Sequence, residues 1–121
     1  MVSKAVWPGV AMIDWGRIED LLAEIGDDGF AEVIDLFLEE TDEVIERLTV
    51  SPDQARIGAD LHFLKGSALN LGFRELALLC QEGERRATAG EEGAIDLGPV
   101  VRVYHESKAA FQMGLAQSSA A

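Results

Sequence analysis

Residues 62–72 read HFLKGSALNLG and form the second half of the predicted helix that decides the fold. The helix is expected to begin at Asp53 and to end at about Leu71, with Gly72 just beyond its end. On a helical wheel at about 100° per residue, its large apolar side chains fall on one side. This predicted buried stripe consists of Ile57, Leu61, Leu64, Ala68 and Leu71.

The opposite side of this helix carries His62 among small and apolar residues. Ala59 and Gly66 lie about one turn before and after it, and Leu69 lies two turns after it. Glycine inside a helix is unfavourable by roughly 1 kcal/mol relative to alanine, so Gly66 needs a physical reason. Either a partner approaches the imidazole closely, or another helix packs closely against this one.

Lys65 lies one turn after His62 and could offer its ammonium group to phosphoryl oxygens bound to the imidazole. Taken alone, an exposed lysine usually serves solubility. A free imidazole titrates near pH 6.5, so histidine offers a neutral nucleophilic nitrogen at cellular pH. A residue that accepts a hydrogen bond from the other ring nitrogen would fix the tautomer.

This stretch resembles the signature of histidine phosphotransfer (HPt) domains. The signature has a histidine, then Lys-Gly-Ser, then Asn-Leu-Gly, and all of these stand at residues 62–72, followed by Glu75-Leu76-Ala77 and Cys80. The resemblance covers roughly residues 14 to 115. It implies that His62 is phosphorylated, that Lys65 lies beside the phosphoryl group and that Gly66 leaves room for a receiver domain.

The resemblance also implies a residue on the following helix that accepts a hydrogen bond from the imidazole. Glu84 occupies the matching position, and Gln81 lies one turn from it. The residues expected to contact the partner are Ala59, Phe63, Gly66, Ser67 and Leu69. In the family the first helix contributes to docking, so Trp15, Ile18 and Leu22 are further candidates, although each fits the core equally well.

The chain departs from the family pattern at two positions. Leu69 stands where a small residue is usual, and it either adds an apolar contact for a particular partner or narrows access to His62. Gly83 stands where the family has leucine, and it is expected to weaken the packing of the fourth helix.

Four other helices are expected around this one. Asp14 is a good N-cap for a helix over Trp15–Ile25, with Ile13 and Ile18 placed as a hydrophobic staple. A second helix starts at Asp27 and runs to about Leu48, and Ser51-Pro52-Asp53 opens the third, with Pro52 in its first turn. The fourth spans roughly residues 74–89, and the fifth carries apolar residues from Val100 to Leu115.

Short connections between helices of this length favour antiparallel neighbours. The predicted fold is therefore all-α: an antiparallel up-and-down four-helix bundle with an additional N-terminal helix. We expect an N-terminal extension at residues 1–13, an HPt helical-bundle domain at 14–116 and a frayed tail at 117–121.

Composition excludes several classes of function. The 121 residues include 10 Lys and Arg against 22 Asp and Glu, a net charge of −12 that disfavours nucleic acids and anionic membranes. Cys80 is the only cysteine, so no intramolecular disulfide or multi-cysteine zinc site is possible. We expect a cytoplasmic monomer.

The reaction that the resemblance implies needs no cofactor in this chain. A receiver aspartyl phosphate would donate to His62, and a second receiver would take the group. The partners would be receiver domains of response regulators and of a hybrid histidine kinase, and these would supply the Mg²⁺. The chain would be a carrier and not an enzyme.

Three alternatives stay open. The first is a helical adaptor that is not phosphorylated and only binds a signalling partner. A kinase fragment is disfavoured because Gly-rich ATP-binding sequences are missing from the chain. A metal-dependent enzyme is disfavoured because the two histidines, His62 and His105, lack a paired carboxylate spacing.

Overall fold

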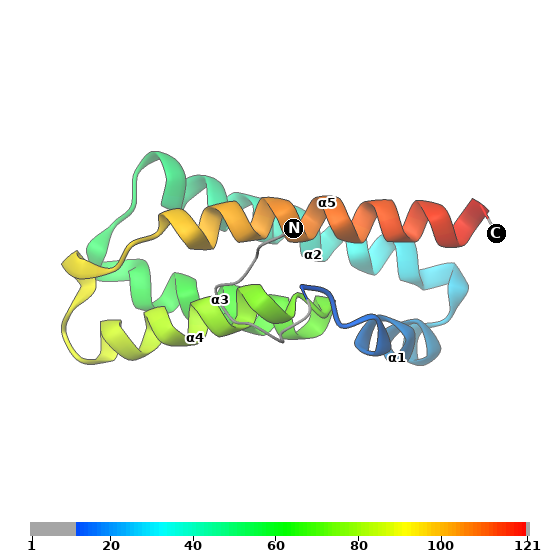
Figure 1. Cartoon of the computed structure of the whole chain (residues 1–121), viewed down its shortest axis with the longest axis horizontal. Coiled ribbons are helices and arrows are strands. Elements are labelled where there is room, and N and C mark those ends of the chain that lie inside the picture. The colour runs from blue at the N-terminus through cyan, green and yellow to red at the C-terminus, as the bar shows by residue number, and fades with distance from the viewer. Residues whose placement is uncertain (1–11, 121) are drawn as a thin grey trace.

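The computed structural model describes residues 12–120, with side chains described for residues 12–116. Its helices are α1 (Trp15–Ile25), α2 (Asp27–Val50), α3 (Gln54–Leu71), α4 (Arg74–Thr88) and α5 (Gly98–Ala120), with a 3₁₀ turn, η1 (Glu92–Ala94), before α5. Helices α2 to α5 run lengthwise as an up-and-down bundle, and α1 lies at the end where α2 begins and α5 stops (Figure 1). The predicted all-α bundle with an extra N-terminal helix is confirmed.

The predicted helix limits agree closely with the observed ones. The Asp14 side chain accepts a hydrogen bond from the backbone N–H of Arg17, and Asp53 accepts one from Ala55, as N-caps do. Pro52 precedes the cap of α3, so its predicted place in the first helical turn is wrong. Helix α5 continues to Ala120 and so includes most of the tail that we expect to fray.

The core lies between the four long helices. Phe73, Tyr104 and Phe111 are fully buried, and the rings of Phe73 and Phe111 meet edge to face with centroids 5.6 Å apart. The apolar stripe predicted on α3 is buried in full, because each of its members is at most 3% exposed: Ile57, Leu61, Leu64, Ala68 and Leu71.

Helix α1 is fastened to the turn between α3 and α4 by backbone contacts. Gly72 has a left-handed backbone (φ 73°), and its carbonyl accepts a 2.7 Å hydrogen bond from the N–H of Asp14. The Met12 carbonyl accepts from the N–H of Arg74 at 3.0 Å, and Ile13 is buried beside Phe73 in an antiparallel bridge. The rest of the expected N-terminal extension lies outside the described residues.

Two ionic contacts join α2 to its neighbours. Asp60 of α3 is only 4% exposed and accepts two hydrogen bonds from Arg47, the shorter at 2.7 Å. Asp42 binds the Tyr104 hydroxyl and the Lys108 ammonium of α5. Burial alone would raise the pKa of Asp42, but these hydrogen bonds outweigh it and lower that pKa.

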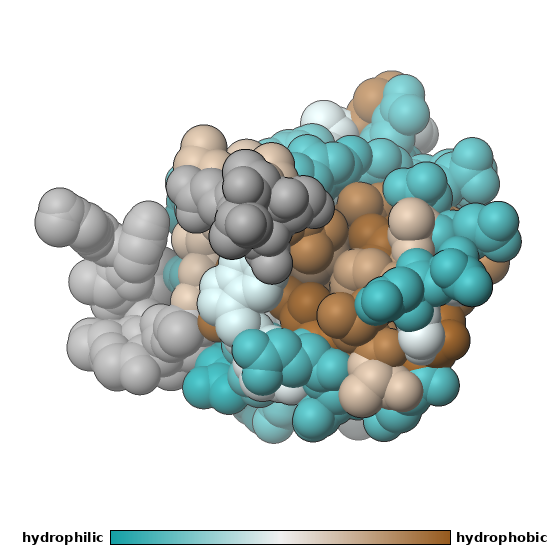
Figure 2. Space-filling view, turned by 90° about the vertical axis from the view of Figure 1, so that its right-hand side faces the viewer, coloured by the Kyte–Doolittle hydropathy of each residue, from teal (hydrophilic) through white to brown (hydrophobic). Residues whose placement is uncertain are grey.

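An apolar hollow of about 460 Å³ opens at the α1 end of the bundle. Figure 2 looks onto this end and shows hydrophobic side chains gathered at its centre with hydrophilic ones around them. Of the α1 candidates for docking, Trp15 is 39% exposed, Leu22 is half-buried and Ile18 is core, and all three line the hollow. Their contact with a partner stays a prediction.

Replacing Gly72 by alanine is expected to destabilise the fold by about 2 kcal/mol or more. The new Cβ would lie 2.6 Å from the Asp14 carbonyl oxygen, in addition to the strain of a positive φ. Gly90→Ala is the matched control, because Gly90 also has a positive φ (81°) but nothing within 4 Å of an added Cβ. Urea unfolding measures both variants, and equal losses would contradict a special approach of α1 at Gly72.

Candidate functional site

The site is built where α3 and α4 pack side by side. A Cβ added to Gly83 would lie 2.7 Å from Cδ1 of the fully buried Leu61, and one added to Gly58 would lie 3.3 Å from Cβ of Ala87. We expected Gly83 to weaken this packing, and that expectation is wrong. The missing side chain lets α4 approach α3 closely, which places Glu84 opposite His62.

Glu84 bridges the two candidate catalytic residues of α3. One carboxylate oxygen, Oε2, lies 2.8 Å from Nδ1 of His62, and the other, Oε1, lies 2.8 Å from Nζ of Lys65. The His62 side chain is 72% exposed, whereas those of Lys65 and Glu84 are 27% and 22% exposed. The imidazole is thus held from one side by a shielded ion pair and open to solvent on the other.

The charge on Glu84 sets the tautomer of His62. Burial by itself raises the pKa of Glu84, but hydrogen bonds from Lys65 and His62 outweigh it and lower the pKa below its ordinary value. An ionised carboxylate can only accept hydrogen bonds, so Nδ1 of His62 carries the proton in this contact. In the neutral ring, Nε2 is then the nitrogen with a free lone pair.

The surface around His62 is exposed, and small residues lie one turn before and after it. Ala59 and Gly66 are exposed, and a Cβ added to Gly66 would meet nothing within 4 Å. Within the described residues, no neighbouring helix packs against Gly66, so close helix packing does not explain why position 66 is a glycine. Phe63 and Leu69 are 38% and 58% exposed and add apolar surface beside the imidazole.

Ser67 does not belong to this surface, so its predicted contact with a partner is wrong. The residue is only 6% exposed and lies on the core side of α3. Five residues at about 100° each place it roughly 140° from His62 around the helix. Its position beside Gly66 in the signature therefore does not reflect a shared face.

The family model for the Hpt domain matches residues 32–121. The chain belongs to the Hpt domain family. The matched part contains α3 and α4 with His62, Lys65 and Glu84, whereas α1 precedes it. No curated protein and no solved structure matches the chain. Membership gives this Hpt domain a role in histidine phosphotransfer within phosphorelays.

The other polar candidates of the Hpt domain form no hydrogen bond with His62 within the described residues. Gln81 is exposed and lines a hollow with Leu69 and Ala77, and it is Glu84 that contacts His62. His105 is exposed on α5 with its ring against the edge of Tyr104, at a centroid distance of 5.4 Å.

The described part of the Hpt domain contains neither a metal-binding cluster nor a membrane-spanning helix. Within residues 12–120, no group of three or more His, Cys, Asp or Glu side chains is arranged to hold a metal ion. Over the same residues, no helix combines the length and the apolar character that crossing a membrane requires.

A small hollow that the sequence does not predict lies beside Glu84. It has a volume of about 200 Å³, and Ala59 and Thr88 are among its lining residues, as is Glu92 of η1. Nothing in the sequence pattern indicates that η1 folds back beside α3.

The ionic contacts of Glu84 predict a pH-dependent loss of stability in Glu84→Gln. Because its folded-state pKa is lowered, they stabilise the fold above the pKa of an unfolded glutamate, about 4.3, and this stability is lost as pH falls through the folded value. Urea unfolding should show the variant less stable than the parent at pH 7, with a difference that shrinks between about pH 5 and pH 3. A difference independent of pH would contradict an ionised Glu84.

Proposed function

We propose that this Hpt domain accepts a phosphoryl group on Nε2 of His62 from the aspartyl phosphate of a receiver domain and passes it to a second receiver. The observation that carries the proposal is the contact between Nδ1 of His62 and Glu84, made while the imidazole is 72% exposed. A histidine held in one tautomer and open to solvent is suited to attack a group presented by another protein.

The transfer step uses only groups that these proteins contain. The lone pair on Nε2 of His62 attacks phosphorus in line, and the bond between phosphorus and the aspartyl oxygen breaks. The bonding electrons stay on that oxygen, so the donor regains its carboxylate. The second receiver reverses the step: its aspartate attacks phosphorus, and the P–N bond electrons return to Nε2.

Glu84 serves the reaction through its negative charge. Positive charge grows on the imidazole as Nε2 bonds to phosphorus, and the carboxylate 2.8 Å from Nδ1 stabilises that charge. The same contact keeps the proton on Nδ1, so that the ring returns as a neutral nucleophile after transfer. Glu84 is therefore a positioning and electrostatic residue that never contacts the phosphoryl group.

Lys65 neutralises the group once it has arrived. Its ammonium lies 2.8 Å from Oε1 of Glu84 and one turn along α3 from His62. Rotation about its flexible stem takes the ammonium from the carboxylate to phosphoryl oxygens on Nε2. The ion pair with Glu84 thus keeps the Lys65 ammonium beside His62 until the doubly charged phosphoryl group is bound there.

The receiver is expected to supply the rest of the catalytic machinery. Phosphoryl transfer depends mainly on positioning and on charge neutralisation, and a receiver Mg²⁺ would provide most of the latter. This chain then acts as a carrier and not as an enzyme, in the cytoplasm and as a monomer. Its surface for the receiver comprises Ala59, Phe63, Gly66 and Leu69.

A transfer assay with matched histidine variants tests the proposal. After incubation with a phosphorylated receiver, the parent chain should carry a label that is acid-labile and alkali-stable. His62→Gln should abolish that label, and His105→Gln, which changes the other histidine, should retain it. Binding of receivers without any label would contradict phosphotransfer and support the adaptor.

The variant Gly66→Gln distinguishes an effect on the receiver's access to His62 from an effect on folding. The position is helical with open space around it, so the variant should keep its helical circular dichroism and be stabilised by up to about 1 kcal/mol. A glutamine side chain one turn from His62 should hinder the receiver and slow transfer at least about tenfold. Normal transfer, or loss of the helical signal, would contradict the role assigned to Gly66.

A further inference from the structure

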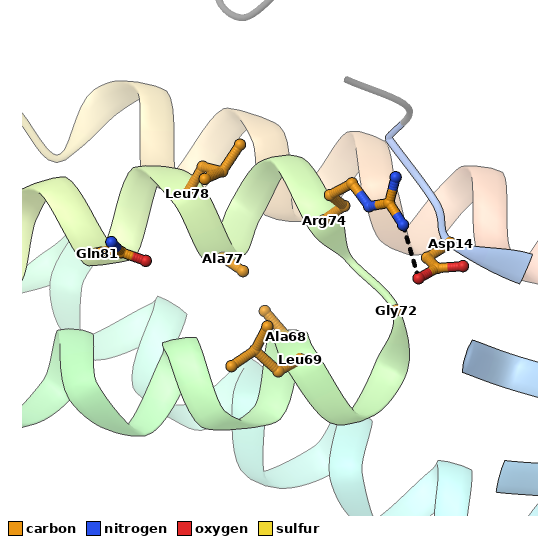
Figure 3. Close-up of a pocket in the computed structure, with 8 residues that line it drawn as sticks. All are labelled: Asp14, Ala68, Leu69, Gly72, Arg74, Ala77, Leu78 and Gln81. Carbon is orange, nitrogen blue, oxygen red and sulfur yellow. Dashed lines mark hydrogen bonds and ion pairs between the residues drawn. The ribbon is translucent and has the colours of Figure 1, made fainter. Parts of the chain in front are cut away.

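A second feature of the α3–α4 pair, separate from the imidazole site, is an apolar hollow of about 250 Å³. Figure 3 shows Ala68 and Leu69 of α3 facing Ala77 of α4 across it, with the Arg74–Asp14 ion pair closing one end. Leu78 and Gln81 line it further along α4. Ala68 and Ala77 face each other at its floor, and the hollow exists because these two side chains are small.

The size of the hollow indicates what it can hold. Pockets for small-molecule ligands usually measure about 300–1,000 Å³, so this one falls below that range. Its lining presents mostly apolar atoms, and the Asp14 carboxylate at its end is already bound by Arg74 at 2.8 Å. It fits one aliphatic side chain and offers little to a charged or polar ligand.

The position of the hollow indicates which protein supplies that side chain. Leu69 lies seven residues after His62 on the same exposed face of α3, a distance of about 10 Å along the helix. A standard interface covers about 800 Å² of each partner, equivalent to a disc of about 16 Å radius. A receiver centred on His62 therefore covers the hollow as well.

We propose that the hollow between Leu69 and Ala77 is a specificity pocket that takes one aliphatic side chain of the receiver domain, an inference that rests on the proposed function. Side chains that are fully desolvated in well-packed pockets carry most of the binding energy of an interface. Leu69, which is 58% exposed, forms one wall. Receivers that present a polar or small residue at this point bind less well.

Filling the pocket and removing its wall test the proposal together. Ala77→Leu occupies the hollow and Leu69→Ala opens it, and each should raise the Kd for a cognate receiver about tenfold or more. Leu36→Ala is the matched control, because Leu36 is a 54%-exposed leucine on α2 outside the hollow, and its Kd should stay at the parent value. Thermal unfolding shows whether Ala77→Leu and Leu69→Ala fold. If one of them does not, the Kd of the other decides the result.

A small phosphodonor distinguishes the failure of this inference from the failure of the proposed function. Phosphoramidate needs no docking surface, so its rate of phosphorylation measures the reactivity of His62 in every variant. The rate of phosphorylation by the receiver is then divided by the rate with phosphoramidate, and these ratios are compared between variants. Folded variants that bind and react with receivers like the parent overturn the specificity pocket alone. A parent chain that no receiver binds or phosphorylates overturns both the pocket and the proposed function.

Two other occupants would also overturn the inference. A dimer of the parent that Ala77→Leu abolishes in sedimentation would assign the hollow to a second copy of the chain. Tighter receiver binding by Trp7→Ala would assign the hollow to the N-terminal residues of this chain, which precede the lining residue Asp14.

Discussion

The close approach of α4 to α3 at Gly83 is the constraint on which the rest of the site depends. Leu61 fills the space that a side chain at position 83 would need, and Gly58 meets Ala87 in the same way farther along the pair. The next residue after Gly83 is Glu84, whose carboxylate lies 2.8 Å from the imidazole. Steric fit at these two glycines thus brings the charged groups together, and a wider spacing would leave His62 without its partner.

The distribution of charge follows from what a phosphoryl carrier must do. Glu84 holds Lys65 and His62 at once, so its negative charge is paired with an ammonium group on the shielded side of the imidazole. Two further ion pairs, Arg47 with Asp60 and Asp42 with Lys108, join α2 to α3 and α5. These two pairs stabilise the bundle, whereas the contacts of Glu84 serve both its stability and the reactivity of His62.

Features that one helix determines by itself can be predicted from the sequence, whereas features that depend on contacts between helices cannot. Helical periodicity predicts the buried stripe of α3, and the Ser51-Pro52-Asp53 break and Gly72 predict its limits to within one or two residues. Ser67 was misplaced because neighbours in a signature need not share a helix face, and the effect of Gly83 was misjudged because its contact lies on another helix. The Arg47–Asp60 pair was missed for the same reason, since no local pattern marks a buried aspartate.

The central claim is that Nε2 of His62 carries the phosphoryl group while Nδ1 keeps its proton for Glu84. Nuclear magnetic resonance of the ¹⁵N-labelled chain tests it directly, after incubation with a phosphorylated receiver domain. The account predicts one-bond coupling between phosphorus and Nε2 of His62, with Nδ1 still protonated. Coupling to Nδ1, or phosphorus on any other residue, would contradict it.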